Sequence, residues 1–110
     1  MDDGKLSFGQ ILERKVESYC TQMSVAIPRI RVKRFRSRWG SCSSKGRISF
    51  NLKLVLAPPA VIDYVVVHEL AHLREMNHSA RFWAIVGKNF PGYKEQKKWL
   101  RHNGHLLRLD

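Results

Sequence analysis

With 110 residues and a mass of 12.8 kDa, the chain has room for a single domain around one hydrophobic core, predicted to span residues 1–110. Its 44% hydrophobic content argues against disorder, and no apolar run approaches the roughly 20 residues that a membrane-spanning helix needs. A formal net charge of +11 favours anionic partners, nucleic acid among them, although a solvated basic surface explains the same charge.

A first helix is predicted from Ser7 to Met23. Ser7 and Gln10 have the spacing of a capping box, and apolar residues then recur at intervals of three and four. Cys20 lies on this apolar face, whereas Cys42 falls in a turn, and the two cysteines form no metal-binding or redox motif. Because the N-terminus also lacks a basic and apolar leader, we expect a cytoplasmic protein.

Two stretches alternate between apolar and polar residues in the manner of half-buried strands. The first contains Ile30 and Val32, and the second runs from Ile48 to Leu54. Residues 39–46 between them are rich in turn formers. We therefore expect a small antiparallel sheet of about three strands.

The second half of the chain is predicted to be helical. A helix over residues 60–76, with Pro59 in its first turn, is apolar on nearly every face and should be central and buried. Another helix, capped by Ser79, and a last one over residues 93–102 follow. The fold class is therefore α+β, with the sheet packed on three to four helices.

His68, Glu69 and His72 form the motif HExxH inside the central predicted helix. Residues four apart share one face of a helix, so both imidazoles can bind one metal ion. Glu69 beside them can act as the general base that takes a proton from metal-bound water, while the ion polarises the scissile carbonyl. Such side chains are costly to bury unless they are coordinated or paired. The pattern predicts a zinc-dependent hydrolase, most simply a peptidase acting on peptides or proteins, with one zinc ion.

Catalytic zinc usually takes three protein ligands, so a third ligand is needed. His78 is our candidate, because a tight turn after the helix can return it to the ion. Its spacing from His72 equals that of the metzincins, but Glu75 stands where their glycine would be. Glu75, His102 and His105 are the alternative ligands. Glu75 would otherwise orient a ligand imidazole or pair with a nearby arginine.

The chain carries further motifs around HExxH: WGSC (Trp39–Cys42), Asn51, Pro58, IDYVVVHELAHL (residues 62–73) and NHSARFW (residues 77–83). This set resembles the YgjP-like metal-dependent hydrolases and the minigluzincins, which are very short HExxH peptidase domains. The resemblance implies a zincin (gluzincin-like) minimal catalytic domain with a three-stranded antiparallel sheet on helices. It also implies that His68, His72 and His78 bind zinc and that Glu69 is the general base.

The resemblance to minigluzincins further implies that the C-terminal segment covers the cleft and holds the enzyme latent, as a zymogen. Residues 105–110 contain three leucines and are apolar enough to lie in a peptide-binding groove. Packing of this tail on the core is the alternative.

A peptidase must also align its substrate, and many do so by adding the peptide to an exposed sheet edge. We predict that the substrate-binding residues are Trp39, Gly40, Ser41 and Cys42. A donor to the oxyanion is usual as well, and the sequence leaves four candidates open: Tyr64, Arg81, Tyr93 and His102.

The alternative function is a basic nucleic-acid-binding module that retains a zinc site. Basic residues concentrate between Arg29 and Lys53, and Phe35 and Trp39 are available to stack on bases. The two functions are compatible, since SprT-like proteins resemble this helix motif and act as proteases on DNA-bound proteins. A purely structural zinc site is disfavoured, because it would usually carry four ligands and would have no use for Glu69.

Overall fold

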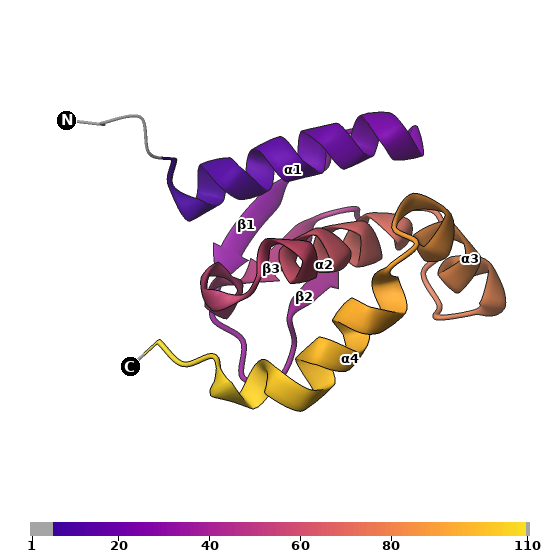
Figure 1. Ribbon diagram of the computed structural model, residues 1–110. Coiled ribbons are helices and arrows are strands. Elements are labelled where there is room, and N and C mark those ends of the chain that lie inside the picture. The colour runs from indigo at the N-terminus through magenta and orange to yellow at the C-terminus, as the bar shows by residue number, and fades with distance from the viewer. Residues whose placement is uncertain (1–5, 110) are drawn as a thin grey trace.

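The computed structural model describes residues 6–109 and shows a three-stranded sheet with four α-helices (Figure 1). The α-helices are α1 (Phe8–Met23), α2 (Pro59–Ala71), α3 (Ala80–Asn89) and α4 (Tyr93–Asn103). The strands are β1 (Ile30–Lys33), β2 (Gly40–Cys42) and β3 (Ile48–Asn51), and short 3₁₀ helices span Leu52–Leu56 and Gly104–Leu106. The predicted α+β class is confirmed. Residues 1–5 of the predicted domain and Asp110 of the predicted tail lie outside the described residues.

The first helix begins where the sequence predicts. The Ser7 hydroxyl accepts a hydrogen bond from the Gln10 backbone N–H (3.1 Å), and the Ser7 N–H donates to the Gln10 side chain (2.9 Å). This capping box satisfies donors that an uncapped helix would leave unpaired. One face of α1 is buried through Leu12, Val16, Cys20 and Met23. That face packs against α2, which makes α1 the outer cover of the core.

The sheet is mixed, whereas the sequence predicts an antiparallel sheet. Its strand order is β1-β3-β2, with β2 antiparallel to β3 in a hairpin and β1 parallel to β3. All four residues of β3 are buried, whereas β1 and β2 are only partly so, and the most buried strand therefore takes the central position. Alternation in the sequence indicates strands but does not give their direction. β2 is consequently an edge strand.

The strand predicted to reach Leu54 ends at Asn51, whose side chain is buried. Its Oδ1 accepts a hydrogen bond from the Lys53 N–H (3.0 Å), which starts the 3₁₀ helix. Its Nδ2 donates to the carbonyls of Phe35 (3.3 Å) and Arg38 (2.7 Å). A single buried amide thus turns the chain out of β3 and fixes the loop that leads into β2.

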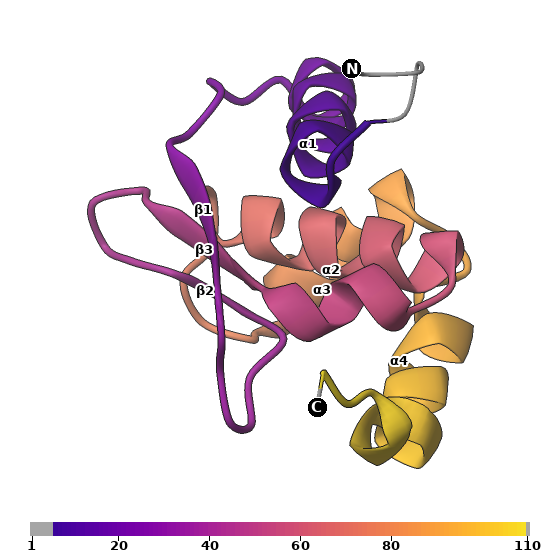
Figure 2. The ribbon, with the colours of Figure 1, turned by 90° about the vertical axis from the view of Figure 1, so that its left-hand side faces the viewer.

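Helix α2 is central, as predicted, and lies between α1, the sheet and α4 (Figure 2). Nine of its 13 residues are buried. It ends at Ala71 and not near Met76, because the N–H groups of His72, Leu73 and Arg74 donate to carbonyls three residues back, at 3.0–3.1 Å. Hydrogen bonds of this 3₁₀ type tighten a helix end and change the direction of the chain.

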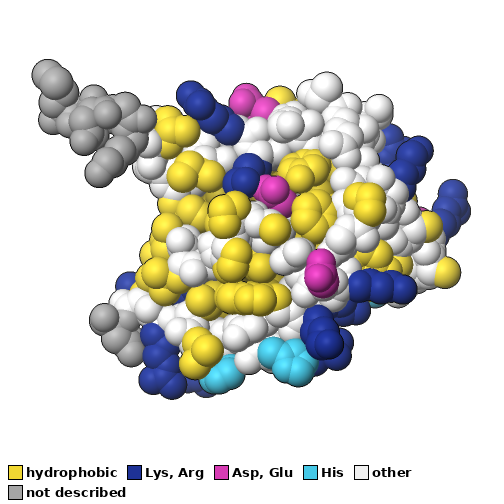
Figure 3. Space-filling model, in the orientation of Figure 1, with side chains coloured by type: hydrophobic (Ala, Val, Ile, Leu, Met, Phe, Trp, Pro, Cys, Tyr) yellow, Lys and Arg dark blue, Asp and Glu magenta, His cyan; other side chains and the backbone are white. Residues whose placement is uncertain are grey.

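Helices α3 and α4 also pack against α2. The Ser79 hydroxyl accepts from the Phe82 N–H (3.3 Å) and caps α3 as predicted. In the face seen in Figure 3, basic side chains gather along the lower and right-hand edges, and the acidic ones stand apart from one another. Within the described residues, no helix is long and apolar enough to cross a membrane.

Candidate metal centre

Helix α2 and the residue that caps its C-terminus present the HExxH side chains to one side of the molecule. The ring centroids of His68 and His72 lie 5.1 Å apart, as expected for residues four apart on a helical turn. His72 is 8% and Glu69 4% exposed, so both are buried, and His68 is partly exposed. Burial at this level requires partners for each polar group.

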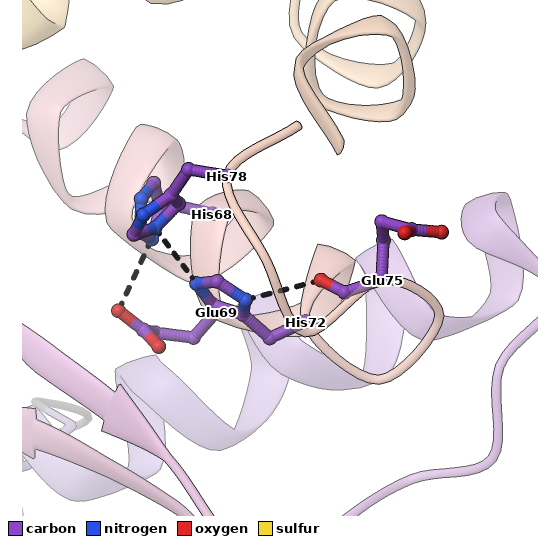
Figure 4. A network of polar contacts seen from close by, with 5 residues as sticks. All are labelled: His68, Glu69, His72, Glu75 and His78. Carbon is purple, nitrogen blue, oxygen red and sulfur yellow. Dashed lines mark hydrogen bonds and ion pairs between the residues drawn. The ribbon is translucent and has the colours of Figure 1, made fainter. Parts of the chain in front are cut away.

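The tight turn after α2 brings His78 back to the two helical histidines (Figure 4). The Nε2 atoms of His72 and His78 lie 3.1 Å apart. One ligand atom from each of the three imidazoles falls within 4.8 Å of the others, an arrangement suited to one metal ion. Burial, together with the neighbouring His68 and His72, lowers the pKa of His78, so its ring stays neutral and able to bind a metal near pH 7.

The backbone of Glu75, and not its carboxylate, orients His72. The His72 Nδ1 lies 3.2 Å from the Glu75 carbonyl oxygen (Figure 4). Because a carbonyl can only accept, Nδ1 carries the proton in this contact, and the Nε2 lone pair remains free for a metal. The Glu75 carboxylate instead lies 4.0 Å from Arg81. Of the alternative ligands, His102 and His105 stand outside the cluster of three histidines.

Glu69 lies directly beneath strand β2. A Cβ placed on Gly40 would come within 2.9 Å of the Glu69 Cγ and Oε2 atoms, so any larger residue here would displace this carboxylate. The Glu69 Oε2 lies 3.2 Å from the His68 Nδ1. Strand β2 and helix α2 therefore meet at the Glu69 carboxylate, and the sheet helps to position this side chain.

A cavity of about 590 Å³ opens over the three histidines. Its lining includes all four predicted substrate-binding residues, Trp39, Gly40, Ser41 and Cys42. Burial, and then the negative charge of Glu69, raises the pKa of the Cys42 thiol, which disfavours a reactive thiolate. Of the oxyanion candidates, Tyr64 lines this cavity, whereas Arg81, Tyr93 and His102 do not.

Phe82 forms the floor of the cluster, a role that sequence reasoning did not assign. Its buried ring has its centroid 4.4 Å from that of His72, 4.9 Å from His78 and 5.0 Å from His68. In the sequence, Phe82 is an apolar residue of the predicted helix after Ser79 and part of the motif NHSARFW, with no role in the site assigned to it. Its position three residues after the Ser79 cap, and so close to His78, is the signal that points to the site.

The rings of Trp39 and Phe35, the two residues suggested for base stacking, already contact other parts of the protein. A Cβ on Gly104 would lie 2.7 Å from the Trp39 ring, so that ring packs against the end of α4. The Phe35 ring is partly buried, and the Lys33 amine lies over it, 5.1 Å from its centroid. Both rings are therefore engaged by other parts of the protein, which does not favour their use in base stacking.

Comparisons with known proteins agree with this geometry. Residues 5–103 match the family model of the YgjP-like metallopeptidase domain. The structure is similar to the metallopeptidase zymogen abylysin of Pyrococcus abyssi, with 27% identity and a TM-score of 0.75, over 88% of this chain and 96% of that one. The metallopeptidase zymogen jannalysin of Methanocaldococcus jannaschii shares the fold, with 18% identity and a TM-score of 0.72, over 83% and 94%. No curated protein sequence matches the chain.

If the three histidines bind one ion, His78→Ala should weaken zinc binding by at least about 100-fold, more than the loss of an outer hydrogen bond to a ligand usually costs. Titration against a competing chelator measures this affinity. His105→Ala is the matched control and should bind zinc as the wild type does, because His105 lies outside the cluster. Equal losses in the two variants would contradict the assignment.

Proposed function

The chain belongs to the YgjP-like family of metallopeptidase domains, and from this premise we propose that it is a zinc-dependent peptidase. His68, His72 and His78 hold the ion, and Glu69 is the general base. The proposal rests mainly on the three imidazoles, whose ligand atoms lie within 4.8 Å of one another. They stand next to a buried carboxylate and are open to a cavity. Three ligands with one open side are typical of catalytic rather than structural zinc.

The protein's own residues supply the proton transfers. His68, His72 and His78 would hold the zinc, which when bound would lower the pKa of water and polarise a peptide carbonyl. The Glu69 carboxylate accepts the proton of the attacking water and delivers it to the leaving amine. Gly40 allows the close approach of β2 that keeps the carboxylate in place, and the contact between His72 and the Glu75 carbonyl fixes the His72 tautomer.

Strand β2 is the surface on which we propose the substrate aligns. It is an edge strand, and Gly40, Ser41 and Cys42 all line the cavity. An extended peptide that pairs with this edge passes over Glu69 and the histidines. The buried Asn51 amide supports this arrangement, because it holds the carbonyls of the loop just before β2.

Tyr64 is the residue that we propose stabilises the oxyanion. It lies one turn before His68 on α2, with the two ring centroids 5.8 Å apart, and it lines the cavity. Burial, and then the charge of Glu69, raises the pKa of Tyr64 to about 12, so its hydroxyl stays protonated and can donate at neutral pH. The described residues offer this hydroxyl no hydrogen-bond partner, and it is not a fully buried atom.

The role of Glu69 is tested by Glu69→Gln in a quenched-peptide assay with zinc measured by elemental analysis. We expect about one zinc per chain in both proteins and a fall in kcat of about 10²- to 10⁴-fold, the usual contribution of a general base. Glu75→Gln is the control and should keep its activity, because only the Glu75 backbone contacts a ligand imidazole. Full turnover by Glu69→Gln would exclude the proposed mechanism.

Tyr64→Phe removes the hydroxyl but keeps the ring that packs beside His68. Loss of one oxyanion donor typically lowers kcat by about 10²-fold or more, and KM should change little because the donor acts in the transition state. Tyr19→Phe on α1, outside the cavity, is the matched control. A Tyr64→Phe protein with wild-type kcat would show that another group stabilises the oxyanion.

We also propose that the C-terminal tail, residues 105–110, keeps the enzyme latent by moving over the cleft. The supports are the two similar structures, which are both zymogens, and the place of the tail beside the loop that precedes β2. Leu107 is buried, and it shares a neighbouring cavity with Trp39 and Arg38, which also line the metal cavity. Leu106, in contrast, is 65% exposed and is free to reach another surface.

Deletion of residues 106–110 should raise kcat/KM for a peptide substrate if the tail restricts the cleft. Since the deletion also removes the buried Leu107, the full-length Leu107→Ala variant serves as the control for lost packing. We expect activation in the deletion alone, with melting temperatures recorded for both proteins. An unchanged kcat/KM in a folded deletion variant would rule out latency through the tail.

A further inference from the structure

Helix α4 brings two cations into the metal cavity that the proposed chemistry does not use. Lys97 and Arg101 are four residues apart, so they lie on one face of α4, and both line the cavity over the histidines. Both also line a second cavity, which adjoins the first and has Trp83, Tyr93, Lys94 and Lys98 as its other walls. The two cavities therefore share a basic boundary.

Lys97 is held in place by an aromatic stack. Its amine lies 4.1 Å from the centroid of the Trp83 ring, a cation–π contact. The Trp83 ring stacks on Tyr93, with centroids 5.4 Å apart and an interplanar angle of 19°. The Trp83 ring also lies 5.9 Å from the His78 ring, at an interplanar angle of 27°. A fixed positive charge thus stands next to a proposed metal ligand.

The protein itself does not neutralise this charge. Neither Lys97 nor Arg101 forms an ion pair with an acidic residue in the described part of the chain. Of the described residues, Glu69 is the only carboxylate that lines the metal cavity, and it lies beneath Gly40. Glu95, the acidic residue of α4, lines neither cavity. A substrate in the cleft therefore meets two cations that no acidic residue of the described chain pairs with.

We propose that Lys97 and Arg101 form a carboxylate-binding subsite of the substrate cleft. The enzyme would then prefer peptides that place an acidic side chain or a free C-terminal carboxylate beside the metal. Arginine binds a carboxylate through two parallel hydrogen bonds, and the stacked Lys97 adds a positioned point charge. This inference rests on the proposed peptidase function, but it concerns binding and can be tested without turnover.

The test uses zinc-loaded Glu69→Gln protein and fluorescein-labelled peptides followed by anisotropy. The peptides share a neutral sequence and carry Glu, Gln or Lys at one central position, each with a free or an amidated C-terminus. We expect a carboxylate to strengthen binding about fivefold to tenfold at low salt and less at high salt. If the amidated Glu peptide binds more tightly than the amidated Gln peptide, the acidic side chain is the ligand. If the Gln peptide with a free C-terminus binds more tightly than its amidated form, the C-terminal carboxylate is the ligand.

Charge reversal separates the subsite from general electrostatics. In the Lys97→Glu, Arg101→Glu protein the preference should invert toward the Lys peptide, an outcome that misfolding cannot produce. Lys88→Glu on α3 is the control, since Lys88 lines neither cavity. Equal affinities for all the peptides, or the same change in the Lys88→Glu protein, would overturn the proposal. A retained charge preference in a protein whose wild type cleaves no peptide would instead refute the peptidase and leave the subsite standing.

Discussion

The last turn of α2 is closed by hydrogen bonds between residues three apart, and the arrangement of the site depends on that turn. Had α2 continued through His78, that residue would lie about 9 Å further along the helix axis than His72, beyond the reach of a common ion. The tight turn instead places the Nε2 atoms of His72 and His78 3.1 Å apart. Arg74 secures the turn, because its guanidinium donates to the Met23 and Ser24 carbonyls at the end of α1 (3.1 and 2.9 Å). The outer helix thereby holds the turn that leads to His78.

The second constraint is the contact between the sheet edge and Glu69. A buried carboxylate needs a polar neighbour and room, and here it has the His68 imidazole on one side and the bare backbone of Gly40 on the other. The same edge strand is the one on which we propose the substrate aligns, so Gly40 joins the proposed base to the proposed substrate-binding surface. The buried Asn51 amide donates a hydrogen bond to the Arg38 carbonyl in the loop before β2. A polar residue of the core therefore helps to hold one wall of the cavity.

Much of the fold follows from local patterns in the sequence. The capping box at Ser7, the Ser79 cap and the apolar run of α2 are short-range signals, and the helices begin where these signals place them. The parallel pairing of β1 with β3 was not predictable in this way, because it depends on which strand is most buried in the folded protein. The end of α2 was misjudged for a similar reason, since the residues after Ala71 have ordinary helix propensities and the turn is held by tertiary contacts such as that of Arg74.

The site could be predicted where a motif fixes spacing, and less well where contacts come from distant segments. HExxH and its distance to His78 sufficed to name three residues that the structure brings together. The ring of Phe82 beneath the imidazoles and the choice of Tyr64 among four candidates required three-dimensional positions. The most direct measurement is X-ray absorption at the zinc edge on protein loaded with one equivalent of zinc. We predict three imidazole nitrogens at about 2.0–2.1 Å from the zinc, with one oxygen. Two imidazoles with a carboxylate or a sulfur ligand would contradict it.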